Sequence, residues 1–243
     1  MNQTRSRFVT LEEAKNVAGA LKESELVYHK SGQSQSLTPT IAITDFIVDG
    51  ELYFKLLASY YYVSEKLQIL VVETKDHNND TVEFSEKIWE YNLDKKKYHH
   101  EKYLNGELTV SEYRDEGYDM PDKIAEFQDA KRFEESVEAQ DTAAAACFLE
   151  NPPFGVEPCC LFEGVEYNYC GSYCGVNRDA GGGAVVNTCD VCCFNHDNCL
   201  ERGDDRCGCH ADILDCLGRY SCPGDSTMGA GMRVKATNDG CYF

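Results

Sequence analysis

The sequence predicts two domains of different kinds, an N-terminal α+β domain and a C-terminal module that is disulfide-rich and mainly α. All fourteen cysteines of the 243 residues lie between Cys147 and Cys241, so the two parts must be stabilised in different ways. The cysteine-free part combines a helical pattern with segments rich in Ile, Val, Tyr and Phe. We place the N-terminal domain at residues 1–120, a helical connector at 121–150 and the cysteine-rich domain at 151–243.

The N-terminal domain is predicted to begin with one helix. Thr10 and Glu13 match a capping box, and apolar residues then recur at helical spacing to about Lys22. Segments with strand character follow, separated by turns that contain Asp, Asn or Gly: 40–48, 52–63, 67–73 and 82–93. The pattern predicts one helix against an antiparallel meander. This layout resembles the pro- or inhibitory domains of secreted bacterial enzymes, and an α+β domain of no particular family is the alternative.

Four histidines of this domain are expected at the surface. None of them has a cysteine nearby or a carboxylate in a rigid pairing with it, so the sequence offers no second ligand or catalytic partner. They are His29, His77, His99 and His100.

The cysteines indicate an oxidising compartment, because a short segment with so many of them relies on covalent cross-links that reducing compartments do not maintain. Up to seven disulfides could form, and zinc binding is the alternative use of the thiols. We therefore expect a secreted or extracytoplasmic protein. No signal peptide is visible, since residues 1–7 are polar and an amphipathic pattern follows. The apolar stretch 67–72 is far shorter than the roughly 18 residues of a membrane-spanning helix.

The charge excludes some partners. The formal net charge is −19, with 17 basic and 28 acidic residues before Cys147 and 6 basic and 14 acidic residues from there on. Neither part has the basic footprint that nucleic acids or strongly anionic membranes require. A zwitterionic lipid surface remains a possible partner, because apolar and aromatic contacts can hold a protein there.

The chemistry is concentrated in residues 190–199, which read D-x-C-C-x-x-H-D-x-C on a predicted helix. Cys193, His196 and Cys199 follow one another at intervals of three and lie on one side of that helix. The His196 imidazole is therefore expected on a rigid, cross-linked face. Rigid placement suits a general base, because proton abstraction depends on hydrogen-bond geometry as well as on pKa.

Asp197 is expected to ligate a hard cation. It points about 100° away from His196 around the helix, and a glycine-rich segment with Gly171, Gly175 and residues 181–183 precedes the helix. Such a loop can turn backbone carbonyls toward an ion, and carbonyl and carboxylate oxygens are what Ca²⁺ prefers. Phosphate binding is the competing use of a glycine loop, but no G-K-S/T follows this one.

Together these residues resemble the active-site helix and calcium loop of secreted phospholipases A2, over about sixty residues. The resemblance implies that His196 deprotonates a water that attacks the sn-2 ester of a glycerophospholipid at a bilayer or micelle surface. Ca²⁺ would be held by Asp197 and by the backbone carbonyls of Tyr169, Gly171 and Tyr173. It also implies two antiparallel helices cross-linked by Cys199–Cys209 and Cys192–Cys216, and a loop cross-linked to Cys193 by Cys170 or Cys174.

The sequence departs from the family at two supporting positions. His210 stands where the family has the aspartate that orients the catalytic imidazole, and Leu200 replaces a supporting tyrosine. His210 or Asp212, two residues further on, are the candidates for the orienting role. These departures leave a non-catalytic, toxin-like or antimicrobial module as the alternative to an enzyme, with a purely structural disulfide module as a third reading. From domain order, we expect the N-terminal domain to cover or restrain the second module.

Overall fold

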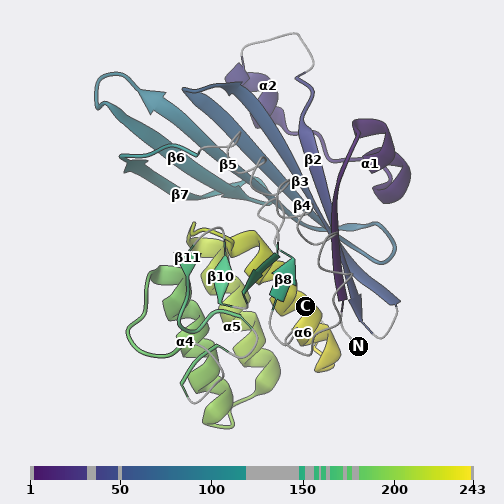
Figure 1. Ribbon diagram of the computed structural model, residues 1–243, viewed down its shortest axis with the longest axis vertical. Helices are drawn as coiled ribbons and strands as arrows, with labels where there is room; N and C mark the ends of the chain where they lie inside the picture. Colours follow the sequence, from purple (N-terminus) through teal and green to yellow (C-terminus); the bar gives the residue numbers. More distant parts are fainter. Residues whose placement is uncertain are drawn as a thin grey trace, which may run out of the picture. The chain divides into compact units, whose positions relative to one another are not determined.

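The computed structural model describes residues 3–31, 37–48, 51–118, 148–150, 156–158, 160–162, 165–171, 174–176 and 181–241. The chain divides into two compact units, Met1–Lys123 and Ile124–Phe243 (Figure 1). Of the predicted connector, only residues 148–150 are described, and they form a short strand, β8 (Phe148–Glu150), paired with β9 (Val156–Pro158). The helix predicted before them lies outside the described residues.

The first unit is an antiparallel sheet of seven strands in sequence order (Figure 1). The meander is confirmed, and the four predicted strands are β2 to β5. The strands are β1 (Gln3–Val9), β2 (Thr40–Val48), β3 (Glu51–Ser64), β4 (Leu67–Asp76), β5 (Thr81–Asn92), β6 (Lys97–Leu104) and β7 (Glu107–Arg114). The strands β1, β6 and β7 were not predicted, because their polar and charged residues lack the apolar alternation of a half-buried strand. Pairing with a neighbouring strand, rather than local propensity, makes them strands.

The predicted capping box is present at the start of α1 (Leu11–Ala18). The Thr10 hydroxyl accepts from the Glu13 backbone N–H at 3.1 Å, and the Glu13 carboxylate accepts from the Thr10 N–H at 2.7 Å. The helix ends at Ala18, before the predicted Lys22, because Gly19 adopts φ 73° and turns the chain away. A second helix, α2 (Glu25–Ser31), was not predicted.

Both helices pack on the same face of the sheet. Ala14 and Ala18 of α1 contact Ile43 and Leu57, while Val27 of α2 packs on Ile69. The strand register places Leu57 and Ile69 on one side, since Leu57 pairs with Glu73 and side chains alternate along β4. This core stabilises the unit without cysteines.

The prediction that all four histidines of this unit lie at the surface is wrong for His100. His29 and His77 are exposed and His99 is half-buried, but His100 is fully buried in β6. Its Nδ1 lies 3.0 Å from the Ile88 carbonyl, and its ring stacks on Trp89 at 4.7 Å between centroids. The register pairs His100 with Trp89, so its side chain lies on the face opposite Ile88 and the helices, where the Trp89 ring also stacks on Tyr118.

In its described residues the second unit is built around three helices, α4 (Thr188–Glu201), α5 (Arg206–Arg219) and α6 (Asp225–Asn238). The disulfides Cys192–Cys216 and Cys199–Cys209 join α4 to α5 as predicted. Residue numbers rise along one helix as they fall along the other, so these two helices are antiparallel. Cys170–Cys193 joins the loop to α4, which decides between the two predicted partners. A further pair of strands, β10 (Leu161–Phe162) and β11 (Val165–Glu166), precedes the helices.

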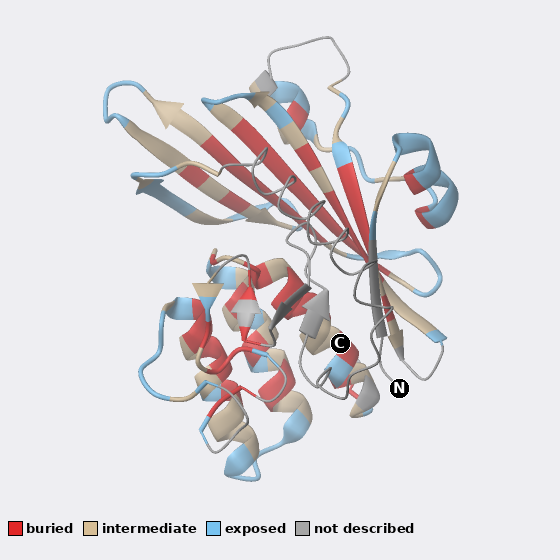
Figure 2. Cartoon of the chain, in the orientation of Figure 1, coloured by how far each residue is buried: buried red, intermediate tan, exposed pale blue. Residues whose placement is uncertain are grey.

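Helix α6 was not predicted, and two further disulfides hold its ends. Cys222 lies just before α6 and bonds to Cys189 at the start of α4, while Cys241 lies just after it and bonds to Cys207 at the start of α5. Figure 2 shows the buried residues of the three helices gathered along their facing sides. The core of this unit therefore consists largely of cystines and aromatic rings, including the fully buried Tyr167.

Candidate active site

Helix α4 carries the two residues that the sequence singled out for chemistry. The Asn187 side chain caps the helix by accepting from the N–H groups of Cys189 and Asp190, at 3.0 and 3.2 Å. His196 follows two turns later and is 7% exposed, whereas about a third of the Asp197 side chain remains accessible. The helix therefore buries the imidazole and leaves the neighbouring carboxylate open to solvent or to an ion.

One nitrogen of the His196 ring is held by a second histidine. His196 Nε2 lies 2.9 Å from Nδ1 of His210 on α5, and Nε2 of His210 lies 2.8 Å from Oδ2 of Asp239. His210 is fully buried, and Asp239 directly follows α6. Two helices and the residue that follows a third thus form a continuous hydrogen-bonded row, which we call the His–His–Asp chain: His196, His210 and Asp239.

Burial, hydrogen bonds and neighbouring charges shift the pKa values of His210 and Asp239. Burial lowers the pKa of His210 below its ordinary value, although the hydrogen bond to Asp239 opposes that shift. Partial burial disfavours the Asp239 carboxylate, but its bond to His210 and the charges of Lys235 and Arg206 outweigh burial and lower its pKa. At neutral pH the chain therefore consists of a neutral His210 against an ionised Asp239.

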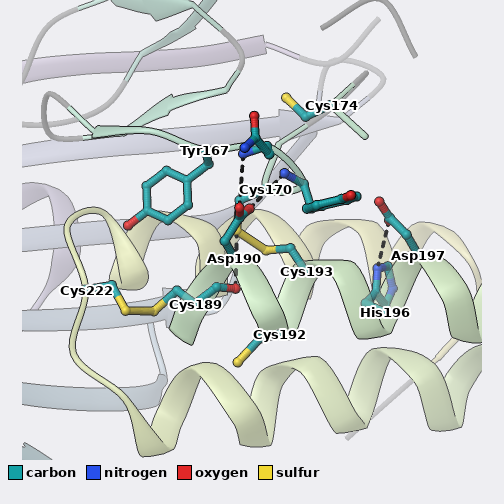
Figure 3. The surroundings of a disulfide bond; sticks show 12 residues. Tyr167, Cys170, Cys174, Cys189, Asp190, Cys192, Cys193, His196, Asp197 and Cys222 are labelled. Atoms are coloured by element: carbon teal, nitrogen blue, oxygen red, sulfur yellow. Dashed lines mark hydrogen bonds and ion pairs between the residues drawn. A yellow bond between two sulfur atoms is a disulfide. The ribbon is translucent and has the colours of Figure 1, made fainter. Parts of the chain in front are cut away.

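The other nitrogen of His196 faces the helix surface. Its Nδ1 lies 3.7 Å from Oδ1 of Asp197, and Figure 3 shows the two side chains turned toward each other at the same end of α4. A distance of 3.7 Å is too long for a hydrogen bond, so Nδ1 can still accept a hydrogen bond from another group. The two ring nitrogens therefore have different environments, one buried and bonded and one directed toward the carboxylate.

Of the two residues named for the orienting role, the structure places His210 beside the imidazole and Asp212 elsewhere. Asp212 is exposed on α5, and among the described hydrogen bonds and ion pairs none joins it to either histidine. On an α-helix a residue two positions from His210 points about 200° away from it, which is the physical reason. Asp239 was missed altogether, because it lies 29 residues beyond His210 and no local pattern links the two.

A buried aspartate organises the loop in front of α4. Asp190 is fully buried, and its carboxylate accepts from the backbone N–H groups of Asn168, Tyr169 and Val186 at 3.2, 2.7 and 3.0 Å. Three N–H donors satisfy a charge that burial would otherwise penalise heavily. Asp190 begins the sequence motif, which predicts no role for it, and in the structure it fixes the loop backbone on the helix.

The glycines of the loop are required by its geometry at two positions. Gly171 is exposed with φ 112°, a conformation that other residues rarely adopt. Gly181 has φ 73°, and a Cβ atom built there would lie 2.3 Å from the Asn168 carbonyl oxygen. Nearby, the Tyr169 hydroxyl donates to the Gly183 carbonyl at 2.7 Å. Of the three predicted carbonyl ligands, Tyr169 and Gly171 lie in this loop, while Tyr173 falls outside the described residues.

The donor set fits calcium better than a transition metal. All twelve described cysteines form disulfides, which removes zinc as their use. Within the described ranges no group of three or more His, Cys, Asp or Glu side chains could hold a metal. An ion at Asp197 would therefore need backbone or water oxygens to complete its shell, as Ca²⁺ readily accepts. The Cys170–Cys193 bond joins the loop to the turn of α4 that precedes His196.

Comparison with known proteins finds a relative of part of the chain. Phospholipase A2 AP-PLA2-I of Acanthaster planci is 41% identical to the chain over 73 residues, which make up 28% of this chain and 44% of that protein. The cysteine-rich module is phospholipase A2-like. The chain spans less than half the length of this relative, and the likeness covers no more than the stated share. No protein-family model and no solved structure matches the chain.

None of the described helices is both long enough and apolar enough to span a bilayer. The six described disulfides of the phospholipase A2-like module are typical of proteins that work outside the cytosol.

Replacing Asp190 should loosen the loop without touching the His–His–Asp chain. Asp190→Asn removes one acceptor oxygen and turns an amide group toward a backbone donor, so the free energy of unfolding should fall by about 2–3 kcal/mol. Asp212→Asn, an exposed aspartate of α5, is the matched control. Denaturant unfolding of the disulfide-bonded protein measures both, and equal stability of the two variants would contradict the role given to Asp190.

Proposed function

We propose that the module is a calcium-dependent phospholipase A2, which hydrolyses the sn-2 ester of glycerophospholipids to a lysophospholipid and a fatty acid. The observation that carries the proposal is the placement of His196. Its ring is buried on a helix cross-linked through Cys192, Cys193 and Cys199, one nitrogen is hydrogen-bonded, and the other is directed toward Asp197. The similarity to phospholipase A2 AP-PLA2-I supports the reaction class.

In this proposal His196 acts through Nδ1 as general base. It takes a proton from a water molecule as the water oxygen attacks the sn-2 carbonyl, and it returns the proton to the departing glycerol oxygen. The proton on Nε2 stays in the hydrogen bond with His210 throughout. Burial of the ring keeps bulk water from competing for the reacting nitrogen.

Asp197, with the backbone carbonyls of Tyr169, Gly171 and Tyr173, would hold the calcium ion. When bound, calcium supplies charge stabilisation for the oxyanion and a contact for the substrate phosphate. The loop's share of this task is to present carbonyl oxygens, and both Asp190 and the Cys170–Cys193 bond stabilise its backbone against α4.

The non-catalytic, toxin-like module remains the second candidate, because His210 and Leu200 replace two supporting residues of the family. The first replacement is offset in the structure, since His210 itself reaches a carboxylate. A restraining role of the N-terminal unit remains a prediction from domain order.

Loss of the base should abolish hydrolysis while the fold persists. His196→Gln should lower fatty-acid release from phosphatidylcholine vesicles at least 100-fold in the presence of calcium, and chelator should do the same to the unaltered protein. His77→Gln, an exposed histidine of the first unit, is the control and should retain full activity. Absence of release by the correctly disulfide-bonded protein would favour the non-catalytic alternative.

Calcium should stabilise the folded protein through Asp197. At a calcium concentration 100 times the dissociation constant, the gain in unfolding free energy is about 2.7 kcal/mol. Asp197→Asn should remove most of this gain, whereas Asp204→Asn, which breaks an exposed pair with Arg202, should not. Thermal unfolding with increasing calcium measures the effect. Equal protection of both variants by calcium would show that Asp197 is not a ligand.

We further propose that the valines beside the loop contact the lipid surface. Val176, Val185 and Val186 are 53%, 42% and 49% exposed, and a Cβ atom built at Gly182 would lie 3.7 Å from the Val176 Cα atom. An exposed apolar group of this kind suits a zwitterionic surface, which an acidic protein can approach without repulsion.

Removing two of these valines should weaken activity at interfaces alone. Val185→Ser with Val186→Ser should lower hydrolysis of phosphatidylcholine vesicles about 30-fold, because roughly 1 kcal/mol of apolar burial is lost per side chain and about 2 kcal/mol for the pair. Hydrolysis of a monomeric short-chain phosphatidylcholine should stay unchanged. Val82→Ser, an equally exposed valine of the first unit, is the control. A parallel loss on both substrates would contradict a role in docking.

A further inference from the structure

The His–His–Asp chain leaves each neutral imidazole with a choice between two tautomers. A neutral histidine carries one N–H donor and one bare acceptor nitrogen, and the hydrogen bond at one nitrogen decides what the other can do. Both nitrogens of His210 are engaged, Nδ1 with His196 and Nε2 with Asp239. The tautomer of His196 therefore depends on the tautomer of His210, and the end of the chain decides both.

Asp239 at the end of the His–His–Asp chain determines which nitrogen of His210 carries the proton. An ionised carboxylate accepts hydrogen bonds and donates none, so Nε2 of His210 must carry the proton in their 2.8 Å contact. Nδ1 of the neutral His210 is then an acceptor, and it requires a donor from His196 at 2.9 Å. Nε2 of His196 supplies that proton, which leaves Nδ1 of His196 bare.

Several contacts keep Asp239 ionised and in place. Lys235 lies 3.3 Å from the same oxygen that meets His210, and Arg206 lies 3.5 Å from the other oxygen. The Asp239 N–H donates to the Lys235 carbonyl at 3.0 Å and closes the end of α6. Two residues later, Cys241 bonds to Cys207, three residues before His210 on α5. A covalent link therefore stabilises the short distance between the carboxylate and the buried imidazole.

We propose that Asp239 is a positioning residue for the hydrolysis, which acts through His210 to set the tautomers of both histidines and leave Nδ1 of His196 as the free base. Asp239 bonds to His210, and none of the described hydrogen bonds or ion pairs joins it to His196. The kinetic consequence rests on the proposed function, whereas the tautomer assignment holds for the resting protein whatever the module does. A simple tie between α5 and α6 would hold the helices together without controlling the proton positions.

The first test reads the proton positions directly in the full chain. With histidines labelled with ¹⁵N, nuclear magnetic resonance at pH 7.5 without calcium should show Nε2 protonated and Nδ1 bare in both His196 and His210. His210→Gln and His196→Gln assign the signals. A proton on Nδ1 of His196 or of His210 in the unaltered protein would overturn the proposal, and this result requires neither turnover nor an Asp239 variant.

The second test changes the end of the chain. Asp239→Ala removes the acceptor, so both rings should populate the other tautomer and kcat should fall roughly 10- to 100-fold with KM within about twofold. Asp239→Glu keeps a carboxylate and should restore a large part of kcat. Asp215→Asn, which alters an exposed aspartate of α5 paired with Arg219, is the control and should match the unaltered protein.

The outcomes separate this inference from the proposed function. If the unaltered protein hydrolyses nothing, the proposed function fails, while the resonance measurement still decides the tautomers. If the unaltered protein is active but folded Asp239→Ala keeps its kcat or its tautomers, the positioning role is wrong. If Asp239→Ala does not fold, Asp239→Glu and the spectrum of the unaltered protein carry the test.

Discussion

The pair of disulfides Cys192–Cys216 and Cys199–Cys209 sets the spacing and direction of α4 against α5, and the site depends on that pair. Each bond holds two Cα atoms 5.8 Å apart, one near each end of the helical overlap. Two cross-links at separate points prevent the helices from sliding or rotating against each other. His196 and His210 lie between the cross-linked positions, and their 2.9 Å contact follows from this rigid frame.

Cross-links also allow the module to bury polar groups that a small core could not otherwise tolerate. Asp190 and His210 are fully buried, and each is satisfied by hydrogen bonds from more than one direction. A buried group that loses its partner costs about 1–3 kcal/mol, so such contacts require a backbone that does not drift. The disulfides provide this by reducing the freedom of the unfolded chain and by restraining the folded one. The disulfides therefore allow His210 to stay buried beside His196 and Asp190 to stay buried beneath the loop.

The two units illustrate opposite solutions to stability. The first has no cysteines and relies on a seven-stranded sheet with α1 and α2 packed on one face. The part of the second that the structure describes has short strands and three helices, and its core includes cystines. The difference follows from composition, because a hundred residues with fourteen cysteines need less apolar area than a domain without any. Both units nevertheless bury charged or polar side chains, as Glu73 with Lys75 shows in the sheet.

The sequence by itself determined the elements whose signals are local. The capping box at Thr10, the strands β2 to β5, the helix with His196 and Asp197, and the cross-linked partner helix could all be read from spacing, propensity and family resemblance. Residues next to one another on a helix face have a fixed relation, so a motif of ten residues predicts their placement.

Only the tertiary structure decided what lies far apart in the chain. The strands β1, β6 and β7 become strands by pairing with their neighbours, and His100 is buried by register. The choice of His210 over Asp212, and the arrival of Asp239 from the end of α6, depend on how three helices meet. No local rule brings residues 43 positions apart into one hydrogen-bonded row, because that proximity is set by packing and by the Cys207–Cys241 bond that closes the fold around them.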